Sequence, residues 1–159
     1  MRGFVREMSV ELLKEYKDAT DNFIRAAKAI PADKLHKAPT SDAWSPANII
    51  HHLADTEVHF YVRYLKILTE EIPQTDFFDE TVYPSRLKYE KRDVEKSLIL
   101  LQSLRESFYN VMSNFTSEEW ERKGKNADVG EYPIIALIKK SRTHIKDHLN
   151  QLQEAIANG

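Results

Sequence analysis

The stretch that decides the fold is SPANIIHHLADTEVHFYVRYLKILTEEIP, residues 45–73. Ser45 is a good helix N-cap, and Pro46 suits the first helical position, where its missing N–H leaves no hydrogen bond unmade. Apolar side chains then recur at three- and four-residue spacing, which predicts one amphipathic helix that ends at about Glu71, before Pro73. Its apolar face is formed by Ile49, Leu53, Phe60, Tyr64 and Ile67. A helix with one apolar face needs other helices to cover it.

Three further segments show the same helical spacing of apolar residues. They run over about residues 8–30, 91–115 and 133–157. No segment shows the alternation that is typical of strands, and residues 124–130 are predicted as a polar loop. The sequence therefore predicts an all-α fold, an antiparallel four-helix bundle with long crossover connections, formed by a single domain over residues 1–159.

Two connections between the predicted helices carry signals of their own. Thr116 and Glu119 form a capping-box pattern, which predicts a short helix around Trp120. Residues 72–90 form a long connection that is rich in aromatic side chains. Structureless loops of this length are uncommon in small domains and are often functional. We expect this connection to pack over one end of the bundle.

The charge of the chain is almost balanced. Its 23 basic and 25 acidic residues give a formal net charge of -2. Nothing in this composition indicates a nucleic-acid partner or an anionic membrane surface. The first ten residues offer no apolar signal-peptide core, and no apolar run approaches the roughly 20 residues that span a bilayer. We therefore predict a cytoplasmic protein with no nucleic-acid and no membrane partner.

The chain contains no cysteine, so any transition-metal site must be built from imidazole and carboxylate groups. His144 and His148 are four residues apart in a predicted helix, and such residues lie one above the other on the same side. A third imidazole from a facing helix, His52, would complete a tripod with open coordination positions for water or substrate. Helical periodicity does not exclude His51 in place of His52. The alternative interpretation is a set of unrelated histidines at the rims of the apolar faces.

Three charged residues of the 45–73 helix have unusual positions. Asp55 lies one turn after His52 and can orient that ring by accepting a ring N–H, or can pair with a nearby Lys or Arg. Glu57 lies near the middle of the apolar face, where a carboxylate must be paired, metal-bound or at the mouth of a site. Arg63 indicates either anion or substrate binding, or a salt bridge.

The order of these motifs resembles a known family. Trp44-Ser45-Pro46, then residues 51–55 (HHLAD), then the His144/His148 pair are similar to the DinB-like superfamily of metal-binding helical proteins. Within it, residues 61–80 resemble the YfiT-type metal-dependent hydrolases of Bacillus. The resemblance covers about residues 23–156.

The resemblance implies a four-helix bundle that holds one divalent ion, zinc or nickel, with three histidines. The first ligand of the family is the histidine directly before Leu-Ala-Asp, which here is His52. The other two form a helical pair near the C-terminus, which here is His144 and His148. Homodimers are frequent in the family. One departure is the Ser-Arg-Thr sequence at residues 141–143, because related proteins often carry more histidines and a tryptophan around this pair.

Two kinds of chemistry suit such a site. A bound metal lowers the pKa of a coordinated water toward ~7 for hydrolysis, or deprotonates a small thiol and presents the thiolate to an electrophile. We therefore predict a metal-dependent enzyme for a small-molecule substrate, either a hydrolase or a transferase that uses a low-molecular-weight thiol. The alternative is a non-catalytic metal-binding or stress-associated bundle.

Overall fold

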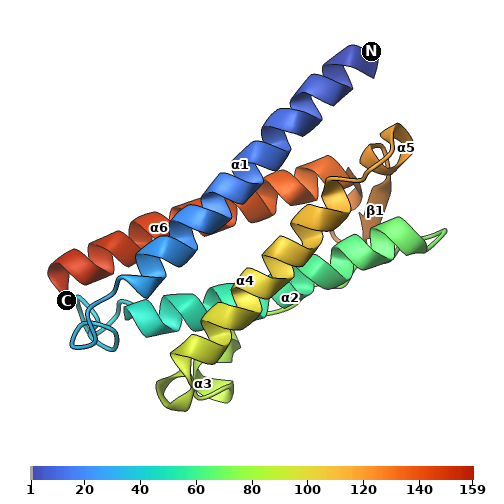
Figure 1. The fold of residues 1–159 in the computed structure, drawn as a ribbon. Coiled ribbons are helices and arrows are strands. Elements are labelled where there is room, and N and C mark those ends of the chain that lie inside the picture. The colour runs from blue at the N-terminus through green and yellow to red at the C-terminus, as the bar shows by residue number, and fades with distance from the viewer. Residues whose placement is uncertain (1) are drawn as a thin grey trace.

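The computed structural model describes residues 2–159, with side chains from Met8 onward. Four long helices make up most of the molecule (Figure 1). They are α1 (Arg2–Lys28), α2 (Pro46–Thr69), α4 (Val94–Met112) and α6 (Ile134–Asn158). The prediction of a helical four-helix bundle is confirmed. Helix α1 begins at Arg2, six residues earlier than the apolar pattern predicted.

Capping residues fix where the helices begin. The Ser45 hydroxyl accepts a hydrogen bond from the backbone N–H of Asn48 at 3.3 Å, and Pro46 is the first residue of α2, as predicted. Asp93 caps α4 by accepting from the backbone N–H groups of Glu95 and Lys96. Helix α4 therefore begins at Val94, three residues later than the predicted start.

The directions of the helices differ from the antiparallel arrangement that was predicted. Asp55 pairs with Arg92 just before α4, and Tyr61 lies 3.1 Å from Ser107 further along. The two contacts follow the same order along both segments, Asp55 with Arg92 and then Tyr61 with Ser107, so α2 and α4 are parallel neighbours (Figure 1). This is possible because the connection between them returns the chain along the length of the bundle instead of joining adjacent ends.

Helix α6 runs antiparallel to α2. His52 near the start of α2 faces the later part of α6, where His148 lies, while Phe60 packs on His144, one turn earlier in α6. Figure 1 shows α6 beside α1 on the other side of the bundle. In the groove between α2 and α6, the first part of α2 therefore lies beside the later part of α6.

The long connection is not structureless, because its second half contains short helices. It contains η1 (Glu80–Val82), α3 (Tyr83–Arg86) and η2 (Tyr89–Lys91). Tyr89 is buried, and its ring lies 5.2 Å from the ring of His51 in α2. The connection thus packs against the first half of α2, the part of the helix that carries the adjacent histidines.

A short hairpin replaces the polar loop that was predicted after the capping-box helix α5 (Ser117–Trp120). Strand β1 (Lys123–Asn126) pairs antiparallel with β2 (Gly130–Pro133). The prediction of no strands was wrong here, because four-residue strands rich in charge and glycine carry no apolar alternation. Gly130 has φ +74°, a left-handed conformation that favours glycine.

A polar layer divides the core of the bundle. Two apolar clusters fill the two halves, one around Phe23 and Leu53 and the other around Tyr16 and Tyr64. Between them each long helix contributes one buried polar residue, and these are Thr20, Glu57, Arg105 and Ser141.

Within this layer the Glu57 carboxylate pairs with Arg105 at 2.9 Å, and their side chains are 2% and 0% exposed. Arg105 also donates to the Thr20 hydroxyl at 2.7 Å and to the Ser141 hydroxyl at 2.8 Å. Its guanidinium lies 4.0 Å from the centre of the Tyr16 ring. Of the roles predicted for Glu57, the structure therefore shows the paired carboxylate.

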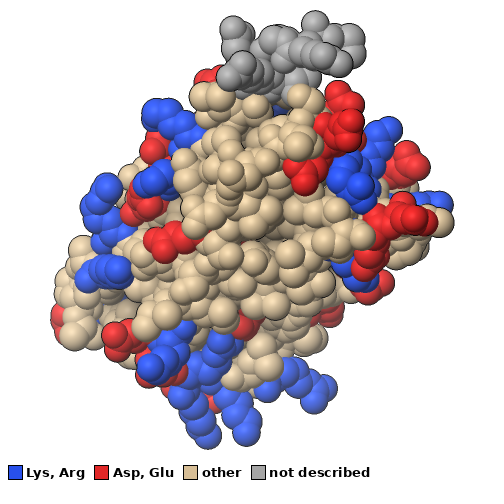
Figure 2. Space-filling model, turned by 45° about the vertical axis from the view of Figure 1, so that its right-hand side comes forward, with Lys and Arg blue, Asp and Glu red and all other residues tan. Residues whose placement is uncertain are grey.

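The surface carries charge of both signs. On the face shown in Figure 2, basic and acidic side chains lie close together along much of the outline, around a broad uncharged area. This mixture agrees with the small net charge of the chain. None of the helices in the described part of the chain combines the length and the apolar character needed to cross a membrane.

Candidate metal centre

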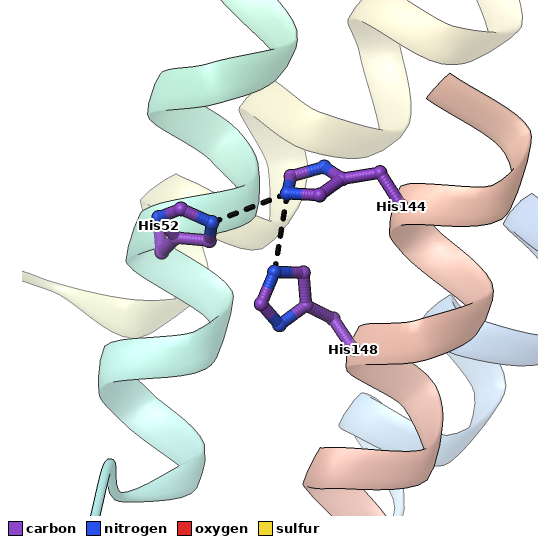
Figure 3. A group of neighbouring side chains, drawn as sticks. All are labelled: His52, His144 and His148. Carbon is purple, nitrogen blue, oxygen red and sulfur yellow. Dashed lines mark hydrogen bonds between the residues drawn. The ribbon is translucent and has the colours of Figure 1, made fainter. Parts of the chain in front are cut away.

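Three histidines from two helices converge in the groove between α2 and α6 (Figure 3). The Nε2 atom of His144 lies 3.3 Å from Nε2 of His52 and 3.1 Å from Nε2 of His148. Potential ligand atoms of the three residues all lie within 4.8 Å of one another. Figure 3 shows all three rings turned toward one shared point.

Local helix geometry and the bundle together produce this arrangement. His144 and His148 are one turn apart on α6, so their rings lie on the same side. His52 reaches them because α2 and α6 are adjacent and antiparallel. The His52 side chain is buried and the other two are half-buried, so the cluster lies at the boundary between the core and the solvent.

Burial keeps the three rings uncharged at neutral pH. Burial, together with the neighbouring His148, lowers the pKa of His52 to about 4. Burial, with the two other rings, lowers the pKa of His144 to about 3. Burial also lowers the pKa of His148. Neutral imidazoles are the form that binds a metal, because protonation removes the ligand lone pair.

Two further residues hold the rings in place. Gln151 lies one turn after His148, and its side-chain oxygen is 2.7 Å from Nδ1 of that ring. An amide oxygen only accepts, so Nδ1 carries the proton and Nε2 keeps its lone pair toward the cluster. The Trp44 ring stacks on His148 at 6.3 Å between centroids and lies at 4.8 Å from that of His52. Sequence reasoning did not assign either role, although the i, i+3 spacing could have indicated Gln151.

The first of the two roles predicted for Asp55, accepting a hydrogen bond from the His52 ring, is not seen. Both oxygens of Asp55 accept from Arg92, at 2.6 and 3.1 Å, and one also accepts from the Tyr89 hydroxyl at 2.8 Å. Nδ1 of His52 is buried without a hydrogen-bond partner. Asp55 therefore matches the second predicted role, pairing with an arginine, and it fixes the connection to α2.

The neighbouring His51 points elsewhere. Its Nδ1 lies 2.8 Å from the Ser97 hydroxyl in α4, and its side chain is fully buried. Adjacent residues on a helix are turned by about 100°, so only one of the two histidines can face α6. In the structure it is His52 that lies beside His144 and His148.

Two of the three distances between the ring nitrogens fit a tetrahedral divalent ion. Zinc binds histidine nitrogen at about 2.0–2.1 Å, which places two nitrogens of a tetrahedral site about 3.3 Å apart. The two distances from His144, 3.1 and 3.3 Å, agree with this value. Three neutral imidazoles would leave a fourth position open.

Two clefts reach the cluster. One, of about 330 Å³, includes His144 and the aromatic residues Phe60 and Phe78 in its lining. The other, of about 280 Å³, is lined by Trp44 and the other two histidines among others. Glu80 lines both clefts. Solvent and small molecules can therefore approach the three rings through either cleft.

Comparison with known proteins agrees with the fold and the motifs. Over 147 residues the chain is 25% identical to a protein of Bacillus cereus strain AH820 named "Putative metal-dependent hydrolase", covering 92% of this chain and 84% of the relative. Proteins of Bacillus anthracis with the same name match equally well.

Solved structures show the same fold. YfiT from Bacillus subtilis, described as "a probable metal-dependent hydrolase with an unusual four-helix bundle topology", matches with a TM-score of 0.82 and 21% identity, over 94% of this chain and 86% of YfiT. A mycothiol-dependent maleylpyruvate isomerase matches with a TM-score of 0.71 and 12% identity, over 91% of this chain and 60% of the isomerase. The sequence model of the DinB superfamily matches residues 15–152. This chain therefore belongs to the DinB superfamily.

Proposed function

We propose that the chain is a metal-dependent enzyme in which His52, His144 and His148 bind one divalent ion, zinc or nickel. The observation that carries the proposal is the convergence of three Nε2 atoms, 3.1 and 3.3 Å apart, in a cluster reached by two clefts. A bound ion at this position would act as a Lewis acid, which lowers the pKa of a coordinated water or thiol.

Other residues of the chain orient the three rings and can accept a proton. Gln151 and Trp44 orient the rings, and the bundle core behind them excludes water from one side of the cluster. Glu80 lies where the two clefts meet, and its carboxylate has no hydrogen bond or ion pair within the described part of the chain. A carboxylate in this position can accept a proton from a nucleophile bound beside the three rings.

Two reaction types follow from this arrangement. The names of the Bacillus relatives support hydrolysis, and the fold shared with a mycothiol-dependent isomerase supports use of a low-molecular-weight thiol. Both reactions need a small-molecule substrate in the clefts. A homodimer and a cytoplasmic location complete the proposal.

Metal binding is the first test. The purified protein is stripped with a chelator and titrated with zinc and nickel by calorimetry, with metal content measured after gel filtration. We expect one ion per chain, and a loss of binding of about a hundredfold or more in His52→Ala, His144→Ala and His148→Ala. His36→Ala, an exposed histidine outside the cluster, is the matched control and should bind as the parent protein does. Equal binding by all four variants would refute the site.

Catalysis is tested on the metal-loaded protein. Ester and amide hydrolysis are compared with transfer of a small thiol to an electrophile, using Glu80→Gln as a variant that keeps the size of the side chain. Turnover that is lost with the histidines, and that in Glu80→Gln changes its pH profile while metal content is kept, would support the enzyme. Metal binding without any turnover would instead assign a non-catalytic metal-binding bundle.

A further inference from the structure

A third cleft, of about 450 Å³, continues the groove away from the three histidines. It lies between the α2–α6 groove and the hairpin, and Tyr132 and Val129 form part of its lining. Arg63, Phe77 and Lys140 line both this cleft and the 330 Å³ cleft that includes His144. The two spaces are therefore joined through these three side chains.

The joint between the two clefts is cationic. Arg63 and Lys140 line both the 330 Å³ cleft and the 450 Å³ cleft. Of these two clefts, each carboxylate lines only one: Asp79 and Glu80 line the smaller, and Asp128 lines the larger. In the described part of the chain neither cation takes part in a salt bridge. The salt bridge that the sequence allowed for Arg63 is thus not formed.

The Arg63 side chain is held in place by two contacts. Its NH2 group donates to the backbone oxygen of Asp76 at 2.6 Å, and its guanidinium lies 5.1 Å from the centre of the Phe78 ring. These contacts leave its charge uncompensated, because a backbone oxygen and an aromatic ring carry no formal charge. A fixed guanidinium loses little entropy when it binds an anion.

Exposed apolar side chains flank the two cations. Phe77 is 75% exposed and Val129 is 72% exposed, although both line the cleft. Side chains this exposed gain little from burial in the fold, and their position in the lining of a cleft makes them available to a ligand. A ligand that satisfies the whole surface would combine an anionic group with an apolar body.

Helix geometry relates this surface to the three histidines. Lys140 lies one turn before His144 on α6, about 6 Å along the axis, and its charge lowers the pKa of that ring. Arg63 lies eleven residues after His52 on α2, which is three turns and about 16 Å along the same face. A molecule held by the two cations would extend along the groove to the tripod.

We propose that Arg63 and Lys140 form the substrate-recognition site, which binds a small molecule with an apolar body and one anionic group, a carboxylate or a phosphate, and directs the rest of the molecule toward the three histidines. The inference rests on the proposed function for the reaction, but the binding site itself requires no metal. Arg63 and Lys140, and not the three histidines, would then select the substrate.

Calorimetry on the metal-free protein tests the proposal with three probes: phenylacetate, benzyl phosphate and phenethyl alcohol. We expect saturable binding of at least one anion, at least about tenfold tighter than the alcohol, because a charge-assisted hydrogen bond contributes more than a neutral one. The tighter of the two anions identifies the preferred charged group.

Variants then separate recognition from general charge. Lys140→Gln should weaken binding of the anion about tenfold and leave the alcohol unchanged. Lys139→Gln is the matched control, because Lys139 is the adjacent exposed lysine and lines neither cleft. Arg63→Gln should act like Lys140→Gln, with circular dichroism to verify the fold. Equal effects of the two lysine variants, equal affinity for alcohol and anions, or no binding of any probe at millimolar concentration would each overturn the proposal.

The outcome is independent of the metal test. A protein that binds zinc but no anion refutes this inference alone, whereas one that binds the anion but no metal refutes the proposed function alone.

Discussion

The buried pair of Glu57 and Arg105 gives the sharpest prediction about stability. Arg105→Met would leave the Glu57 carboxylate in the middle of the core, 2% exposed, with only the hydroxyls of Tyr16 and Ser141 as partners. Breaking a buried pair from one side costs about 3–5 kcal/mol, because the remaining charge is neither solvated nor compensated. This is a large part of the roughly 5–15 kcal/mol that stabilises a whole domain.

Arg105 is charged in the folded protein, so its replacement removes the charge that compensates the Glu57 carboxylate. Burial opposes the charged guanidinium, but the carboxylate of Glu57 and the nearby phenol groups together raise the pKa of Arg105 above its ordinary value. Replacing both partners removes the problem. We expect the double variant Glu57→Gln/Arg105→Met to recover at least about 2 kcal/mol relative to the sum of the two single variants.

Urea unfolding with a chelator present measures these effects without a contribution from bound metal. With a slope of about 2 kcal/mol per M, Arg105→Met should lower the unfolding midpoint by about 1.5 M or more. Lys14→Met, which breaks the exposed pair with Asp18, is the control and should leave the midpoint unchanged. A loss below about 1 kcal/mol in Arg105→Met, or strict additivity in the double variant, would refute the reasoning.

Three further outcomes are expected. Gln151→Leu should weaken zinc binding about tenfold, since His148 loses the acceptor that fixes its tautomer, whereas the exposed Gln153→Leu should not. Gly124→Ala should destabilise the fold by about 1–3 kcal/mol in urea unfolding, because an added Cβ would lie 2.9 Å from the Tyr132 ring; an unchanged midpoint would contradict the packing seen here. Zinc at a hundredfold excess over its Kd should add about 2.7 kcal/mol to the unfolding free energy, and addition of EDTA should abolish this gain.

Local features of the fold were readable from the sequence. Two helix starts, the cap at Ser45 and Pro46 and the capping box at Thr116, depend only on residues a few positions apart. Both could therefore be predicted from the sequence alone. The spacing of His144 and His148 predicted one shared side of α6 for the same reason. The positions of the helices follow from the periodicity of apolar residues, which does not depend on how the helices are arranged in space.

Arrangement in space was decided only by the tertiary structure. Periodicity did not exclude His51 in place of His52, because the choice depends on which neighbouring helix each ring meets. Nothing local predicted that Arg105, 48 residues away, would neutralise Glu57.

The parallel pairing of α2 and α4 and the joined clefts at Arg63 and Lys140 are decided in the same way. They arise because the connection between α2 and α4 travels the length of the bundle, and a chain path of that kind is a property of packing between distant segments. Short-range residue patterns determine which helices form and which side chains share a face, whereas contacts across the bundle determine which of these faces meet.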